Sequence, residues 1–112
     1  MESILTSIKK LLGVPAEHTE FDPDIIMHIN SVFMVLTQIG IGPSSGFSIE
    51  DESTTWDDYI PDVTRVQAIK SYMYAKVRLI FDPPQSSAHI ECLKQTVNEF
   101  EWRLYTEADL YN

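Results

Sequence analysis

The sequence has few of the residues that mark several common protein classes. Only one of its 112 residues is a cysteine, Cys92, so no internal disulfide can form and no second thiol is present to share a metal ion. Long hydrophobic runs are also missing. The uncharged stretch from 25 to 49 is interrupted by polar residues such as Asn30 and Gln38, and a bilayer span needs about 20 mostly apolar residues. We therefore expect no membrane association.

Basic residues are scarce. The sequence contains eight Lys and Arg residues and 17 Asp and Glu residues, which gives a net charge of −9. Ordinary DNA binding relies on Lys and Arg to neutralise phosphates, so this balance argues against it. An acidic surface suits a protein that DNA must pass without sticking, or one that meets a basic partner. Residues 41–61 hold a concentrated acidic group without any basic residue: Glu50, Asp51, Glu52, Asp57 and Asp58.

The length and composition favour one folded domain over residues 1–112, with a single modest core. Hydrophobic residues make up 44% of the chain, which is typical of a globular protein rather than a disordered one. The first residues, Met-Glu-Ser-Ile-Leu, lack the basic region of a signal peptide. We therefore expect a cytosolic site of synthesis.

Apolar residues at helical spacing predict four helices, near 2–12, 23–40, 62–82 and 86–106. Start and stop residues bound them: Asp22 and Pro23 begin the second helix, and Gly40 ends it. The sequence thus predicts a small all-α domain. The second helix is apolar on two sides, because Met27 and Met34 lie opposite its main stripe. We expect another protein chain to cover this outer side.

The second and third helices are joined by a long segment, residues 40–61. Phe47 and Ile49 alternate with polar residues, so the segment is either a long loop or a short β-hairpin arm. Its bulky residues, which also include Trp56 and Tyr59, have two interpretations. They fold the segment back onto the core, or they anchor a neighbouring subunit, since aromatic residues dominate interface energetics.

No group of residues predicts catalysis. Asp24 and His28 lie one helical turn apart, but two ligands are too few for a stable metal site. The acidic cluster of residues 50–58 lacks the glycine of a calcium loop, and no nucleophile or oxyanion site lies beside it in the sequence. The sequence contains no phosphate-binding glycine loop and no Ser/His/Asp set. We predict no enzymatic activity, no cofactor and no metal ion.

Four segments carry a family resemblance: Phe21–Phe33, Thr55–Ile60, Phe81–Pro84 and Phe100–Leu104. Together they resemble the small head–tail connector proteins of tailed bacteriophages and prophages, also called adaptor or head-completion proteins. Such proteins are often named DNA-packaging proteins, although the label implies no packaging enzyme. The resemblance spans nearly the whole chain and rests on structural patterns rather than catalytic ones.

The resemblance implies a structural virion protein at the head–tail junction. Proteins of this kind have a four-helix core with a protruding loop or arm. They form a ring, commonly of about a dozen subunits, beneath the portal protein. The ring extends the DNA channel, lets DNA pass its lumen without specific binding, and docks the next connector or tail-completion protein. The candidate interface residues are Phe47, Ile49, Trp56, Tyr59, Met27 and Met34.

Two other functions are alternatives at this point. The first is a small acidic binding protein that mimics DNA and inhibits a host nucleic-acid enzyme. That function requires carboxylates spaced like phosphates along one face, whereas here they cluster in the 41–61 segment and near the C-terminus. The second is a small metal-dependent hydrolase or nuclease that uses the acidic residues of the loop.

Overall fold

The computed structural model describes residues 2–111 of the chain, with side chains from residue 2 to residue 108. Its helices are α1 (Ile4–Leu12), α2 (Asp22–Ile39), α3 (Trp56–Tyr59), α4 (Val63–Phe81) and α5 (Ser87–Tyr111). Within these residues the structure has no strand, only one isolated antiparallel bridge between Ser3 and Thr55. The all-α prediction is confirmed. Of the two forms considered for residues 40–61, the structure has the loop.

Capping residues explain where the helices begin and end. Ser3 accepts a hydrogen bond from the backbone N–H of Thr6, and Asp62 accepts two from the first turn of α4. Gly13 and Gly40 end α1 and α2 in the left-handed conformation, with φ of 84° and 104°. The start of α2 differs from expectation. Phe21 holds the capping position without a side-chain hydrogen bond, and Asp22 is already helical.

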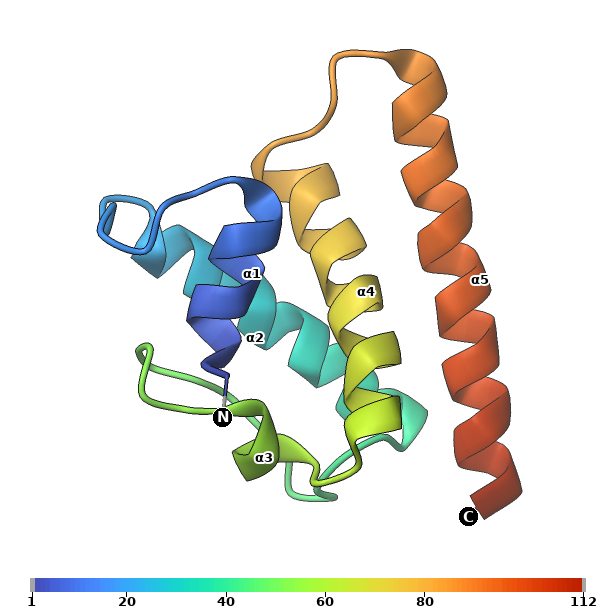
Figure 1. Cartoon of the computed structure of the whole chain (residues 1–112). Coiled ribbons are helices and arrows are strands. Elements are labelled where there is room, and N and C mark those ends of the chain that lie inside the picture. Colours follow the sequence, from blue (N-terminus) through green and yellow to red (C-terminus); the bar gives the residue numbers. More distant parts are fainter. Residues whose placement is uncertain (1, 112) are drawn as a thin grey trace.

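Helix α4 is the centre of the molecule, with α1, α2 and α5 packed around it (Figure 1). Its residues Ile69, Tyr72 and Met73 are fully buried, as is Phe33 of α2. These side chains join one continuous core that reaches from α1 to α5. The molecule is flat, with extents of 39 × 35 × 20 Å.

Helix α5 lies along one edge of the molecule, beside α4 (Figure 1). Its 25 residues span about 37 Å at the usual helical rise. Leu93, Val97 and Leu104 form its buried side. The side of α5 opposite these residues faces outward, as the exposure of Trp102 (69%) shows.

A buried lysine organises the turn between α1 and α2. Lys9 is only 2% exposed. Its ammonium donates hydrogen bonds to the carbonyl oxygens of Ala16 (3.1 Å) and His18 (2.7 Å), and it lies 2.8 Å from a carboxylate oxygen of Asp22. A buried charge is tolerated only when it is paired and hydrogen-bonded. The 13–21 turn therefore wraps around this side chain.

Candidate functional site

The loop residues singled out from the sequence lie mostly inside the chain. Ile49, Trp56 and Tyr59 are buried, and Phe47 is half-buried. Phe47 packs against Phe33 and Tyr59 with ring centroids 5.0 and 4.9 Å apart. Aromatic pairs at such separations add to the stability gained from burial. This arrangement matches the interpretation in which the loop folds back onto the core; the interface role of these residues stays a prediction.

Polar contacts hold the loop in place near its middle and near its end. The indole N–H of Trp56 donates a hydrogen bond to the hydroxyl oxygen of Ser7 (2.9 Å), inside the core. Near the middle of the loop, the amide of Asn30 pairs with the backbone of Ile49 through two hydrogen bonds, 3.0 and 2.8 Å long. These bonds satisfy buried polar groups that would otherwise cost stability. The loop is thus part of the folded domain.

Position 42 requires glycine, because the backbone there lies close to the ring of Tyr59. Gly42 has a φ of 83°, and a Cβ atom placed there would lie 2.6 Å from the Tyr59 ring. Any other residue would therefore both clash and adopt a conformation that side chains disfavour. Burial also raises the pKa of Tyr59 well above its ordinary value. The ring of Tyr59 is a structural element and stays neutral at physiological pH.

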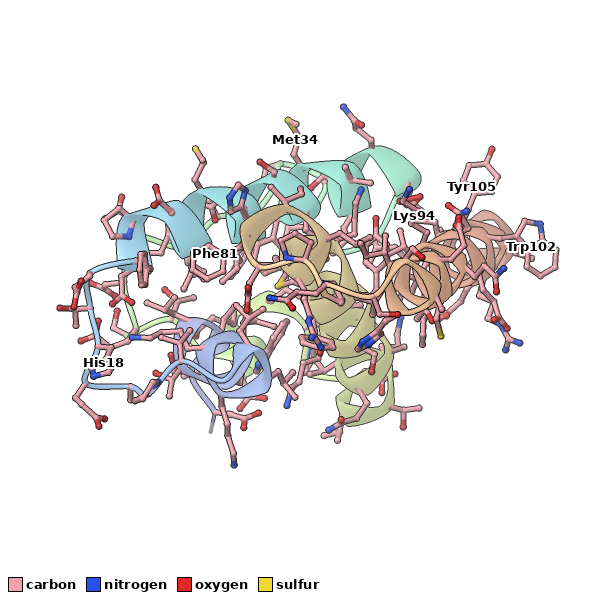
Figure 2. The ribbon with its side chains drawn as sticks, turned by 90° about the horizontal axis from the view of Figure 1, so that it is seen from above. His18, Met34, Phe81, Lys94, Trp102 and Tyr105 are labelled. Atoms are coloured by element: carbon pink, nitrogen blue, oxygen red, sulfur yellow. The ribbon has the colours of Figure 1, made fainter. Side chains whose placement is uncertain are left out.

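The two methionines singled out from the sequence are exposed. Met27 and Met34 lie seven residues apart, about two turns of α2, and are 57% and 58% exposed. Figure 2 shows Met34 pointing away from the body of the molecule. Flexible methionine side chains adapt to varied partner surfaces. Of the candidate interface residues, these two are the ones available to a partner.

A second exposed apolar site, which was not predicted from the sequence, lies on α5. Trp102 and Tyr105 are 69% and 60% exposed and point outward at the edge of the molecule (Figure 2). A signal for this was present in the sequence. At 100° per residue, Trp102 falls on the side of α5 opposite Leu93, Val97 and Leu104. Exposed Trp and Tyr side chains close together are typical of interaction sites.

A cleft opens where the end of α1, the start of α2 and the end of α4 meet. Its volume is about 560 Å³. Leu12, Val14 and Ile80 supply apolar lining, and Phe21 meets Phe81 edge to face at 5.6 Å. The cleft also contains Asp24 and His28, the pair considered above as metal ligands. Within residues 2–108, however, no three His, Cys, Asp or Glu side chains gather as a metal site would require.

The five carboxylates of the loop are all exposed. Two of them, those of Asp51 and Asp58, take part in a turn and a helix cap. Asp58 accepts hydrogen bonds from the backbone N–H and the hydroxyl of Thr55, which begins α3. The hydroxyl and backbone N–H of Ser53 donate to Asp51 and hold the pKa of its carboxyl below the ordinary value. The group presents a negative surface to solvent.

Basic side chains are largely paired within the chain. Lys76 lies 3.3 Å from Glu101, and Arg65 lies 3.0 Å from Glu107, so α4 and α5 are joined by ion pairs. Tyr72 also donates to Glu101, at 2.9 Å. Such pairing leaves few free cations to meet phosphates, which agrees with the charge balance of the sequence. In the described part of the chain, no helix is both long and apolar enough to span a membrane.

Comparison with known proteins gives one family. The family model described as phage connector protein matches residues 4–110. The match includes every helix of the structure, together with the loop between α2 and α4. Searches of curated proteins and of solved structures found no match.

Proposed function

The chain belongs to the phage connector protein family, and we propose that it forms a ring beneath the portal that joins the DNA-filled head to the tail. A connector protein is a structural component of the phage particle. The proposed ring, of about a dozen copies, extends the DNA channel and docks the next connector or tail-completion protein. The observation that carries this proposal is the family match across nearly the whole chain.

The distribution of exposed apolar residues supports contacts on more than one side. Met27 and Met34 lie on the outer side of α2, whereas Trp102 and Tyr105 lie on α5. A subunit in a ring needs separate surfaces for its neighbours and for the proteins above and below. We assign Met27 and Met34 to the portal or the next connector.

We propose that the loop of residues 40–61 contributes to assembly through its shape and charge. Phe47, Ile49, Trp56 and Tyr59 hold it against the core. A loop fixed in this way meets a partner without a large loss of conformational entropy. Its exposed carboxylates would repel DNA or attract a basic partner surface.

The proposal includes the absence of enzymatic activity. Several acidic residues are engaged in a turn, a cap or an ion pair, namely Asp51, Asp58 and Glu101, and the carboxylates of the loop are exposed. A purified protein that cleaves DNA in the presence of Mg²⁺, with activity lost in an Asp57→Asn/Asp58→Asn variant, would favour the nuclease alternative. We expect no cleavage by either protein.

Inactivation of the gene in the phage or prophage that encodes the chain tests the proposed function. We expect normal DNA packaging but an accumulation of DNA-filled heads without tails, since the joining piece is missing. Complementation with the wild-type chain should restore tailed particles. Normal tailed particles without the protein would refute the connector role.

A matched pair of variants tests the assigned surface on α2. Met27→Gln/Met34→Gln removes the apolar contact at exposed positions, so stability should change by no more than about 0.5 kcal/mol. Val63→Gln is the control, because Val63 is equally exposed (64%) but lies at the start of α4. We expect the methionine variant to fail in complementation and the control to succeed.

A further inference from the structure

The outer side of α5 carries a convex group of side chains, which we call the α5 knob: Trp102, Arg103 and Tyr105. All three are strongly exposed, at 60–69%. Trp, Tyr and Arg are the residue types most enriched at energetic hot spots of protein interfaces. Within residues 2–108, the side chain of Arg103 forms one ion pair, an exposed one with Glu99, and such pairs add little stability. The knob is thus free to contact a partner.

The chain also has a concave site of matching chemistry, the cleft between α1, α2 and α4, which we call the α1–α4 cleft. Two of its lining side chains are apolar and themselves exposed: Phe21 (48%) and Ile80 (59%). At about 560 Å³ it has room for an aromatic side chain. Exposed apolar walls around a hollow mark an interaction site rather than ordinary surface.

The charges of the two sites are opposite. Asp24 and Asp82 line the cleft, and neither forms an ion pair within residues 2–108. Asp82 directly follows the last turn of α4, where the free carbonyl groups already carry partial negative charge. The guanidinium of Arg103 would relieve this excess of negative charge. A carboxylate at the rim would also accept the indole N–H of Trp102, which needs an acceptor when buried.

The two sites lie on different edges of the flat molecule. The knob points outward beside α5, away from Phe81 (Figure 2). The cleft lies between the end of α1, the start of α2 and the end of α4, and residues 13, 14 and 21 of the 13–21 turn line it. A convex site and a concave site on one chain can pair reciprocally in a two-fold dimer or successively from copy to copy, and the ring of the proposed function requires the second arrangement. In such a ring the two sites that meet belong to successive copies. They form a head-to-tail contact, which closes into a ring when the rotation between copies allows it.

We propose that the α5 knob of one copy inserts into the α1–α4 cleft of the next copy. In this contact Trp102 packs against Phe21 and Ile80, and Arg103 pairs with Asp82. The occupant is a second copy because the chain itself supplies both complementary halves, in apolar character and in charge. The inference rests on the self-assembly part of the proposed function, and it identifies the surfaces that touch.

Disulfide trapping of purified protein tests the contact directly. All variants carry Cys92→Ser, because Cys92 is exposed and would form unwanted cross-links. The Asp82→Cys/Arg103→Cys variant places one thiol on each site, and Glu52→Cys/Arg103→Cys is the matched control with one thiol moved to the acidic loop. A disulfide needs Cα atoms within about 7 Å. We expect oxidation to give a ladder of dimers, trimers and higher multimers for the first variant, forming about tenfold faster or more than for the control.

Mixing single-cysteine variants separates a knob-to-cleft contact from the pairing of two identical sites. Asp82→Cys mixed with Arg103→Cys should give a dimer quickly, whereas each variant alone should not. Fast dimers from Arg103→Cys alone would mean that the knob pairs with itself, which overturns the proposal. Equal, slow cross-linking in the test and control variants would overturn it as well and would leave the portal as the occupant of the cleft.

A charge exchange supplies a second readout that does not depend on cysteine. Arg103→Asp should abolish the assembly of tailed particles, and Arg103→Asp/Asp82→Arg should restore it at least in part. The cross-linking result stands apart from the connector role, because it is measured on purified chains. If purified protein gives cross-linked ladders but the gene-inactivated phage still forms normal tailed particles, the proposed function is refuted and the knob-and-cleft contact is not. Particles that need the chain but tolerate Arg103→Asp would refute the knob-and-cleft contact alone.

Discussion

The side-chain amide of Asn30 forms a two-way hydrogen-bonded pair with the backbone of Ile49. Its Nδ2 donates to the carbonyl oxygen of Ile49 (3.0 Å), and its Oδ1 accepts from the N–H of the same residue (2.8 Å). The amide thus takes the place of a neighbouring β-strand. It ties the loop between α2 and α4 to the middle of α2 and leaves Ile49 only 2% exposed.

The Asn30→Ala variant tests whether these two hydrogen bonds hold the loop against α2. Loss of two hydrogen bonds, with buried backbone groups left unpaired, should lower the free energy of unfolding by about 1–3 kcal/mol. The loop should also be cut faster in limited proteolysis, because its local opening is easier. Ser31→Ala is the control, since its exposed hydroxyl bonds only to its own helix. Equal cleavage rates in the two variants would mean that other contacts hold the loop.

Truncation of the two tryptophans should have very different effects on the stability of the domain. Trp56 is 3% exposed and bonded to Ser7, whereas Trp102 is 69% exposed. Trp56→Ala should therefore lower the free energy of unfolding by about 3–5 kcal/mol. Trp102→Ala should change it by no more than about 0.5 kcal/mol. Urea denaturation of the purified variants measures both, and a fully stable Trp56→Ala protein would show that this residue is not part of the core.

Lys9 should be far more important for stability than its neighbour Lys10. Lys9→Met leaves Asp22 without its cation and two carbonyl oxygens without their donor. Removing one partner of a buried ion pair costs about 3–5 kcal/mol. Lys10→Met, at an exposed position of the same helix, should cost less than about 0.5 kcal/mol. Thermal denaturation of the two variants should separate them clearly, and similar melting temperatures would contradict the role given to Lys9.

Alkaline pH should destabilise the domain. Burial raises the pKa of Tyr72, and its hydrogen bond to Glu101 raises it further; burial also raises the pKa of Tyr59. Above about pH 10 the unfolded chain releases these phenolic protons while the folded chain keeps them. The free energy of unfolding should therefore fall with rising pH, by about 1.4 kcal/mol per pH unit for each tyrosine.

Tyr72→Phe should make this alkaline fall less steep, because one titrating group is gone. Tyr105→Phe is the control, since Tyr105 is 60% exposed and should leave the slope unchanged. Denaturation curves between about pH 9 and about pH 12 measure the slope. A stability that does not change with pH across this interval would contradict the burial of the two phenols.

The helices were predictable because their signals are local. Asp62, Gly13 and Gly40 mark boundaries through their own side chains or conformations, and apolar stripes identify the packed sides. Helix α5 extends beyond the expected residue 106, to Tyr111, because no glycine or proline stops it. Helix α3 was missed, since four residues are too few to show a period. The capping pair Thr55 and Asp58 was its one signal.

The parts that were missed depend on tertiary contacts. Lysine is seldom buried, and the partners of Lys9 are backbone carbonyls placed only by the fold of the 13–21 turn. Ile80 continues the helical spacing of the buried residues Met73 and Val77, yet it is 59% exposed, because it lines the cleft instead of the core. The exposure of Met27 and Met34 followed correctly from their position opposite the apolar stripe. The cleft had no sequence signal, since three separate elements form it.

The central claim is that this chain is the ring-forming connector between head and tail. Counting its copies per purified, DNA-filled particle by quantitative mass spectrometry, relative to portal subunits, tests this most directly. The account predicts about a dozen copies, close to the number of portal subunits. Absence of the chain from mature particles, or its presence in the hundreds as expected for a capsid or tail-tube protein, would contradict it.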